Sequence, residues 1–131
     1  MAKILVIEDD ITFLGLLRVH LSNLGHEVET AEDAVVGLRS IMEGAPDVIL
    51  LDIYVPYLEG FELLQTLRGD PATSDIPIIV LTGRGDDETY AKARSLGVAG
   101  YFTKPVESDK LIKAIEAQIA LRKARPREEL S

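Results

Sequence analysis

Short apolar runs that each end at a polar residue restrict the fold of this sequence more than any other feature. They occupy residues 4–7, 48–51 and 78–81 and consist largely of Ile, Val and Leu. Continuous apolar runs of this length are typical of parallel strands that are buried on both faces. Weaker segments at residues 27–31 and 99–103 are expected to supply two further strands.

Helical periodicity fills the intervals between these strands. Apolar residues at helical spacing predict five helices, and their stripes are Leu14, Leu17, Leu21 and Leu24; Ala34, Leu38, Ile41 and Met42; Phe61, Leu64 and Leu67; Tyr90, Ala93 and Leu96; and Leu111, Ile115 and Ile119. Gly25 is expected to end the first helix, and Asp33 to cap the second. The fourth helix, over residues 86–96, has few large apolar side chains, so we expect it to be the most movable.

The fivefold alternation of strand and helix predicts an α/β protein with helices on both faces of a parallel sheet. The expected architecture is a flavodoxin-like (βα)5, doubly wound five-stranded sheet with strand order 2-1-3-4-5. The 131 residues fit one domain, which we place at residues 1–122, followed by a flexible tail over residues 123–131.

Composition excludes several classes of protein. The chain has no cysteine, which removes disulfide scaffolds, thiolate metal sites and thiol nucleophiles. Its net charge of −8 argues against direct nucleic-acid binding by this domain, because phosphate binding needs a basic surface. Neither a signal peptide nor a membrane-spanning stretch is expected, so the predicted location is cytoplasmic and no membrane partner is expected.

Acidic residues follow two of the predicted strands. Glu8 and Asp9 come directly after the first run, and Asp52 follows the third strand. The carboxyl ends of parallel strands meet at one edge of a doubly wound sheet, so these side chains are expected to lie together. Crowded carboxylates resist full ionisation unless a cation joins them. The pattern therefore predicts a divalent metal site, with Mg²⁺ as the expected ion and Mn²⁺ as a possible one.

Each of these acids also has a simpler interpretation. Asp52 is suited to metal ligation, to general base work or to nucleophilic attack that forms an acyl phosphate, but it also has the type of side chain that caps a helix. Glu59 lies nearer to the start of the third helix than Asp52 does. Asp10, or Asp9 itself, is suited to cap the first helix, although one cap cannot account for three acids.

Two further residues close predicted strands at the same edge. Thr82 follows the fourth strand, where its hydroxyl is suited to hold a phosphoryl oxygen, and Lys104 follows the fifth, directly before Pro105. A lysine beside three acids is expected to pair with them rather than to stay solvated. His20 and His26 are expected to be surface residues, remote from the acids.

At this point the sequence resembles the receiver domain of bacterial two-component response regulators, from residue 3 to about residue 120. The matching segments are Lys-Ile-Leu-Val-Ile-Glu-Asp-Asp at 3–10, Asp-Val-Ile-Leu-Leu-Asp at 47–52, Pro56 with Gly60, Ile-Pro-Ile-Ile-Val-Leu-Thr-Gly at 76–83, and Gly-Tyr-Phe-Thr-Lys-Pro at 100–105.

The resemblance implies a phosphoacceptor switch in a phosphorelay. Asp52 would take a phosphoryl group from a sensor histidine kinase or a histidine phosphotransfer protein, and the chain would catalyse its own phosphorylation and slow dephosphorylation. Mg²⁺ would be held by Glu8, Asp9, Asp52 and the backbone carbonyl of Tyr54. Thr82 and Lys104 would contact the phosphoryl oxygens, because phosphoryl transfer depends on positioning and electrostatics.

The resemblance also implies how phosphorylation is read out. Thr82 and Tyr101 match the pair that moves when the phosphoryl group arrives, although Tyr101 also fits a plain strand aromatic. The output face would consist of the fourth helix, the fifth strand and the fifth helix, and a homodimer through that face is possible. Tyr54 and Arg84 match variable positions that tune phosphoryl lifetime, and we expect Tyr54 to shield the group.

Some residues depart from the commonest pattern of the family. Gly37 is one of them, and on helix propensity alone a glycine inside the second helix is expected to destabilise it by roughly 1 kcal/mol relative to alanine. Two other functions stay open for the chain. One is a docking or dimerisation module that is never phosphorylated. The other is a flavin-binding electron carrier of the same fold, in which Glu8, Asp9 and Asp10 would repel the cofactor phosphate.

Overall fold

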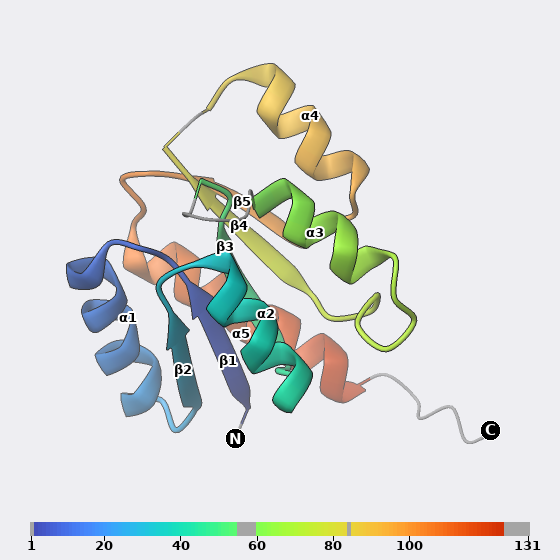
Figure 1. Ribbon diagram of the computed structural model, residues 1–131. Helices are drawn as coiled ribbons and strands as arrows, with labels where there is room; N and C mark the ends of the chain where they lie inside the picture. Colours follow the sequence, from blue (N-terminus) through green and yellow to red (C-terminus); the bar gives the residue numbers. More distant parts are fainter. Residues whose placement is uncertain (1, 55–59, 84, 125–131) are drawn as a thin grey trace.

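The computed structural model describes residues 2–54, 60–83 and 85–124, and within them strands and helices alternate (Figure 1). In chain order the elements are β1 (Lys3–Ile7), α1 (Ile11–Asn23), β2 (Glu27–Ala31), α2 (Ala34–Glu43), β3 (Val48–Asp52), α3 (Gly60–Arg68), β4 (Ile78–Thr82), α4 (Asp87–Ser95), β5 (Gly100–Thr103) and α5 (Ser108–Ala124). All strand pairs are parallel, and the sheet order is β2-β1-β3-β4-β5. The predicted flavodoxin-like architecture is confirmed.

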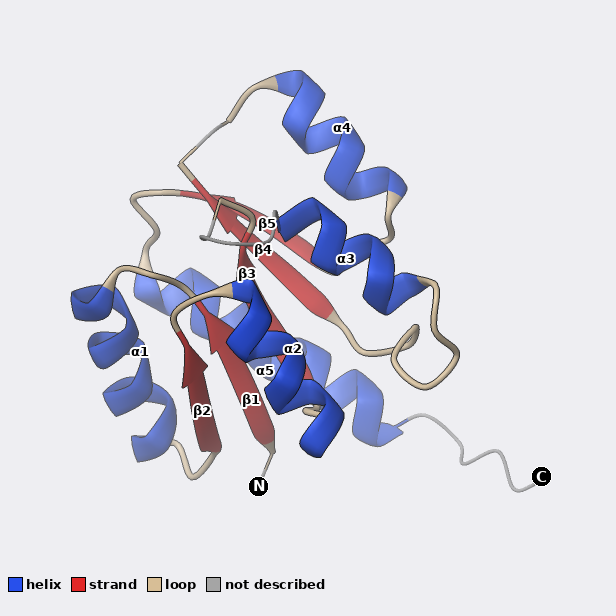
Figure 2. Ribbon diagram, viewed as in Figure 1, coloured by secondary structure: helices blue, strands red, loops and turns tan. Residues whose placement is uncertain are grey.

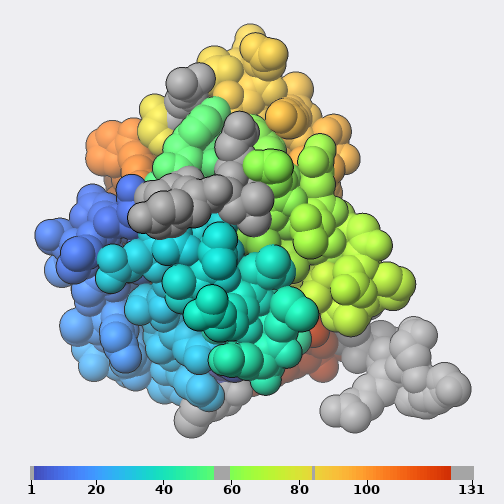
Figure 3. Space-filling view, viewed as in Figure 1, coloured from blue at the N-terminus to red at the C-terminus, as the bar shows by residue number. Residues whose placement is uncertain are grey.

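The sheet separates two hydrophobic cores. On one face α1 and α5 contribute Leu14, Leu17, Leu21, Leu111, Ile115 and Ile119, which pack against alternate strand residues. On the other face α2, α3 and α4 cover the remaining strand side chains (Figure 2). In the space-filling view α2 lies at the lower centre and α4 at the top (Figure 3). Both faces of the central strands are therefore shielded from water, which explains why the sequences of these strands are unbroken apolar runs.

The helix boundaries follow the predicted signals. Asp33 caps α2, and its carboxylate accepts a hydrogen bond from the Val36 N–H at 2.8 Å. Gly25 follows the end of α1 with φ of +90°, a conformation that glycine adopts without strain. At the other end of the chain α5 includes Lys123 and Ala124, which the sequence had assigned to the tail. The remaining tail, residues 125–131, lies outside the described residues.

Four side chains differ from the sequence prediction. Leu24, Met42 and Tyr90 were placed on buried stripes, but their exposed fractions are 52%, 80% and 42%. Leu24 caps α1 rather than lying within it, and the buried stripe of α2 passes through Gly37 rather than Met42. In α4 the buried residues are Thr89 and Ala93, and the mobility of this helix stays a prediction.

The fourth difference is His26, which was expected at the surface. Its side chain is only 9% exposed, and it contacts Ala2, directly before β1, and Glu116 of α5. The ring pairs with the Glu116 carboxylate, and its Nδ1 accepts a hydrogen bond from the Ala2 N–H at 3.4 Å. His20 is exposed, as expected.

Gly37 packs closely against the sheet, which adds a packing contribution to its predicted energetic effect. A Cβ at this position would lie 2.5 Å from Cδ1 and 2.9 Å from Cγ1 of Ile7, a fully buried residue of β1. The helix therefore approaches the sheet more closely than an alanine would allow. Helix propensity does not include packing, so the sign of an alanine substitution here depends on how far Ile7 can shift, and the predicted energetic effect stays a prediction.

Candidate phosphoacceptor and metal site

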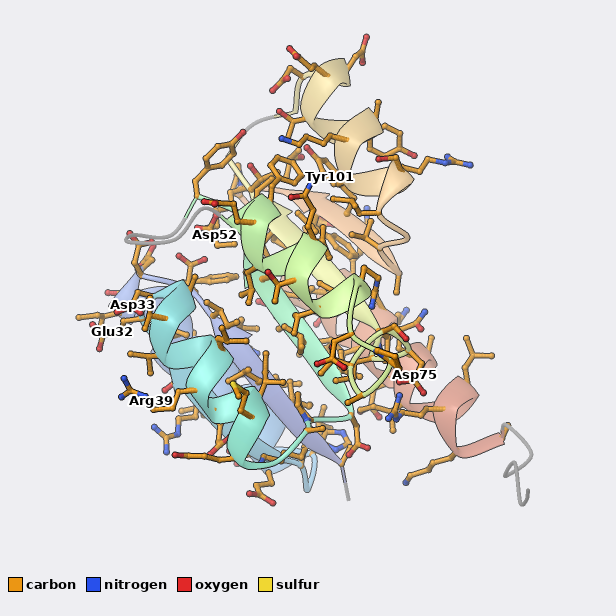
Figure 4. All side chains as sticks on the ribbon, turned by 45° about the vertical axis from the view of Figure 1, so that its right-hand side comes forward. Glu32, Asp33, Arg39, Asp52, Asp75 and Tyr101 are labelled. Carbon is orange, nitrogen blue, oxygen red and sulfur yellow. The ribbon has the colours of Figure 1, made fainter. Side chains whose placement is uncertain are left out.

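The acidic residues meet at the carboxyl edge of the sheet, where β1 and β3 lie side by side. Asp52 is the last residue of β3 and is 6% exposed, and Figure 4 shows it at the end of that strand. Glu8 directly follows β1 and is fully buried, whereas Asp9 is exposed. One carboxylate oxygen from each of the three acids lies within 4.8 Å of the others. The structure thus brings them together as the topology predicts.

Local hydrogen bonds give Glu8 and Asp10 different structural roles. The Asp10 N–H donates to Glu8 Oε2 at 3.0 Å, which turns the chain after β1. Asp10 then caps α1 by accepting a hydrogen bond from the Phe13 N–H at 3.1 Å. Of the two acids that sequence reasoning left open for this cap, Asp10 therefore fills it. Asp9 is left available to a ligand.

Asp52 is held in place at both of its carboxylate oxygens. Its Oδ1 accepts from the Tyr54 N–H at 3.0 Å, and its Oδ2 lies 3.0 Å from the Lys104 ammonium nitrogen. Helix α3 begins eight positions later, at Gly60. Among the described residues the Asp52 carboxylate therefore contacts Lys104 and the Tyr54 N–H and caps no helix.

Lys104 joins the two buried acids. Its Nζ lies 2.6 Å from Glu8 Oε1 as well as 3.0 Å from Asp52 Oδ2, which matches the predicted pairing of this lysine. The Lys104 N–H donates to the Thr82 carbonyl at 2.8 Å, and the peptide bond to Pro105 is cis. The Phe13 ring also faces the ammonium group, with its centroid 5.5 Å from Nζ. Sequence reasoning missed Phe13, although its place three residues after the helix cap was a usable signal.

The electrostatics of the site reflect burial and crowding. Burial raises the pKa of Glu8 to about 6, although its hydrogen bond with Lys104 acts in the opposite direction. For Lys104, burial acts to lower the pKa, because it disfavours the charged ammonium form. The hydrogen bonds to Glu8 and Asp52 outweigh burial, so the pKa of Lys104 is raised overall. Two of the three carboxylates pair with one ammonium group, and the cluster keeps an excess of negative charge when all three are ionised.

This donor set fits a small divalent cation. Its ligands are hard carboxylate oxygens close enough to share one ion, without the histidine or cysteine ligands that zinc prefers. Desolvation disfavours the ionised form of the buried Glu8 carboxylate, so a nearby cation would stabilise that form.

Two of the remaining predicted residues lie on the strands β4 and β5. Thr82 ends β4 and is fully buried, and its register partner on β5 is Thr103. Tyr101 of β5 is half-buried and packs edge-on against Tyr90 of α4, with ring centroids 5.1 Å apart. Burial raises the pKa of Tyr101, with a further contribution from the nearby charge of Asp86.

Tyr54 lies two residues after Asp52 and reaches towards α4. Its side chain is 42% exposed, and its hydroxyl lies 3.5 Å from Oγ1 of the buried Thr89. The Thr89 hydroxyl in turn donates to the Asp86 carboxylate that caps α4, at 2.8 Å. Arg84, the other predicted tuning residue, lies outside the described residues, as do Pro56 and Glu59.

Known proteins similar to this chain are consistent with one another. The family model of the response regulator receiver domain matches residues 4–116. Protein PilH of Pseudomonas aeruginosa is 36% identical over 120 residues, which cover 92% of this chain and 99% of PilH. The DNA-binding dual master transcriptional regulator RpaA of Synechocystis is 32% identical over 117 residues, which cover 89% of this chain but 48% of that protein.

Solved structures give the same result. A CheY-like response regulator receiver domain protein from Methanospirillum hungatei superimposes with a TM-score of 0.87 at 28% identity, and the match covers 94% of this chain and 97% of that one. The chain spans nearly all of PilH and about half of a longer regulator such as RpaA. Within the described residues no helix combines the length and apolar character needed to cross a membrane. Fold, acid cluster and matches together show that this chain belongs to the receiver domain family of the response regulators of two-component signalling.

Proposed function

We propose that this chain is a phosphoacceptor switch and that Asp52 receives the phosphoryl group. The observation that carries the proposal is the arrangement around its carboxylate. Asp52 is 6% exposed, its oxygens are held by Lys104 and by the Tyr54 N–H, and the Glu8 and Asp9 oxygens lie beside them. A carboxylate fixed in this way is preorganised for attack on an incoming phosphorus atom.

The donor class follows from the family, whose members receive phosphoryl groups from histidine kinases or phosphotransfer proteins. An Asp52 carboxylate oxygen attacks the phosphorus of a phosphohistidine, and a P–O bond forms as the P–N bond breaks. The imidazole leaves with the electron pair of that bond and takes up a proton. Lys104 and Thr82 are placed at the ends of β5 and β4, where they would hold the phosphoryl oxygens. Since these donors present their phosphohistidine in the cytoplasm, we place the chain in that compartment.

A divalent cation belongs to this proposal. Mg²⁺, or Mn²⁺ in its place, would be held by Glu8, Asp9, Asp52 and the backbone carbonyl of Tyr54, and it would neutralise the charge that collects on the phosphoryl oxygens. Lys104 alone supplies one positive charge against three carboxylates, so the transfer is expected to depend on the metal.

The response to phosphorylation is assigned to Thr82 and Tyr101. The phosphoryl group would draw the Thr82 side chain towards Asp52, and Tyr101 would move inward behind it and change its contact with Tyr90. The surface formed by α4, β5 and α5 would then present a different face to a partner or to a second copy of the chain.

The experiment that tests this function is intact mass spectrometry after incubation with Mg²⁺ and a small phosphodonor such as acetyl phosphate. The parent should gain one phosphoryl group, and Asp52→Asn or excess chelator should prevent the gain. The matched control is Asp75→Asn, because Figure 4 shows Asp75 at the opposite end of the sheet from Asp52. An unmodified parent, or a modified D52N variant, would contradict the proposal and favour a docking module that is never phosphorylated.

A further inference from the structure

Four residues around the site form a closed circuit of contacts. Glu8 Oε2 accepts from the Asp10 N–H, and Asp10 Oδ1 accepts from the Phe13 N–H. The Phe13 ring faces Lys104 Nζ at 5.5 Å, and Nζ lies 2.6 Å from Glu8 Oε1. The cap of α1 therefore fixes the position of an aromatic ring relative to the lysine of the site.

The circuit leaves the Lys104 ammonium group few directions in which to move. Glu8 and Asp52 lie on two of its sides, and the ring covers a third. Phe13 is itself half-buried and packs against the core between α1, α5 and the sheet. The next residue, Leu14, is 6% exposed and anchors the helix turn. Because the ring is held by both cap and core, it restrains a side chain that is otherwise long and flexible.

We infer that Phe13 is a positioning residue for phosphoryl transfer, which acts by holding the Lys104 ammonium group above Asp52. The inference rests on the proposed function, since it assigns Phe13 a role in that reaction. A cation over an aromatic face is attracted by the ring quadrupole, and at partly exposed sites this attraction corresponds to roughly a 2- to 5-fold change in a rate or equilibrium constant.

The test is a double-mutant cycle on the rate of phosphorylation by acetyl phosphate at saturating Mg²⁺. Phe13→Leu keeps an apolar side chain but removes the aromatic face, and Phe13→Tyr restores that face. Lys104→Gln removes the ammonium group. Phe102→Leu is the matched control, because Phe102 is a partly buried ring that packs against the same core from β5. Urea unfolding of each variant checks that it is folded under the assay conditions.

Phe13→Leu should slow phosphorylation by about 2- to 5-fold in the parent and have no further effect when Lys104 is already Gln. Phe13→Tyr and Phe102→Leu should stay within about 2-fold of the parent. A loss that persists in the K104Q background would assign Phe13 a general packing role and overturn the inference, as would an unchanged rate in F13L. A parent that takes up no phosphoryl group would refute the proposed function itself. A parent that reacts normally, together with an F13L variant that reacts at the same rate, would refute only the role of Phe13.

Discussion

Gly37 of α2 packs directly on Ile7 of β1, and a Cβ added to this glycine would lie 2.5 Å from the Ile7 Cδ1. Ile7 is fully buried in the core shared by α2, α3 and the sheet, so its side chain has little room to move aside. Two effects of an alanine at position 37 therefore oppose each other. Helix propensity favours alanine by up to about 1 kcal/mol, whereas overpacking typically destabilises by about 1–3 kcal/mol.

We expect Gly37→Ala to lower the free energy of unfolding by about 1 kcal/mol, because the packing effect is the larger of the two. Gly15→Ala is the matched control. Gly15 is exposed within α1 and a Cβ there meets no atom within 4 Å, so that variant should be stabilised by about 0.5–1 kcal/mol. Urea unfolding of both variants measures the difference. Adding Ile7→Val, which removes Cδ1, should relieve G37A, and a stabilised G37A single variant would contradict the packing argument.

This pair also shows where sequence reasoning stops. The strands, their order and the meeting of Glu8, Asp9 and Asp52 were predictable, since they follow from apolar runs and from the rule that parallel strands end at one edge. The close approach of Gly37, the burial of His26 and the position of the Phe13 ring were not, because each depends on distances between elements far apart in the chain. Periodicity reports which face of a helix is apolar, but not how closely that face approaches the sheet.

A second glycine contact lies next to the site. A Cβ on Gly60 would lie 2.4 Å from the Ile53 Cα and 2.7 Å from the Ile53 carbonyl oxygen, and these are backbone atoms directly after Asp52. Since backbone cannot change rotamer, Gly60→Ala should destabilise the protein more than Gly37→Ala does, by about 2 kcal/mol or more. It should also slow phosphorylation, because Ile53 must move. Urea unfolding and the mass assay measure the two effects, and a G60A variant as stable as the parent would rule out this contact.

The metal-free protein should lose stability as pH rises through the titration of Glu8. Burial raises the pKa of Glu8 from 4.5 to about 6, so the folded state retains a proton that the unfolded chain releases earlier. The contribution of Glu8 is therefore fully present below about pH 4.5 and is lost by about pH 6, and it amounts to at most roughly 2 kcal/mol.

Glu8→Gln isolates this contribution, because the glutamine carries no titrating proton. Urea unfolding in the presence of chelator, at about pH 4.5 and about pH 7, should show the parent losing more stability than E8Q between the two values. Added Mg²⁺ should reduce the difference at the higher pH, since the ion compensates the ionised carboxylate. Parallel pH dependence in the parent and E8Q would show that Glu8 ionises in the folded protein as it does in the unfolded chain.

Tyr54 is predicted to lengthen the lifetime of the phosphoryl group by limiting the access of water. Its N–H donates to Asp52 Oδ1, and its hydroxyl lies 3.5 Å from Thr89 Oγ1, so the side chain extends from the end of β3 towards the start of α4. Tyr54→Ala should lose the phosphoryl group faster, by about 3-fold or more, which corresponds to a barrier lowered by roughly 0.7 kcal/mol. Tyr54→Phe keeps the ring but not the hydroxyl contact, so its rate should lie between those of the parent and Y54A.

The decay of the phosphorylated mass after removal of the donor gives all three rates. A Y54A variant that decays at the parent rate or more slowly would refute the shielding role, whereas equal rates for Y54F and Y54A would assign the effect to the contact with Thr89 rather than to the bulk of the ring.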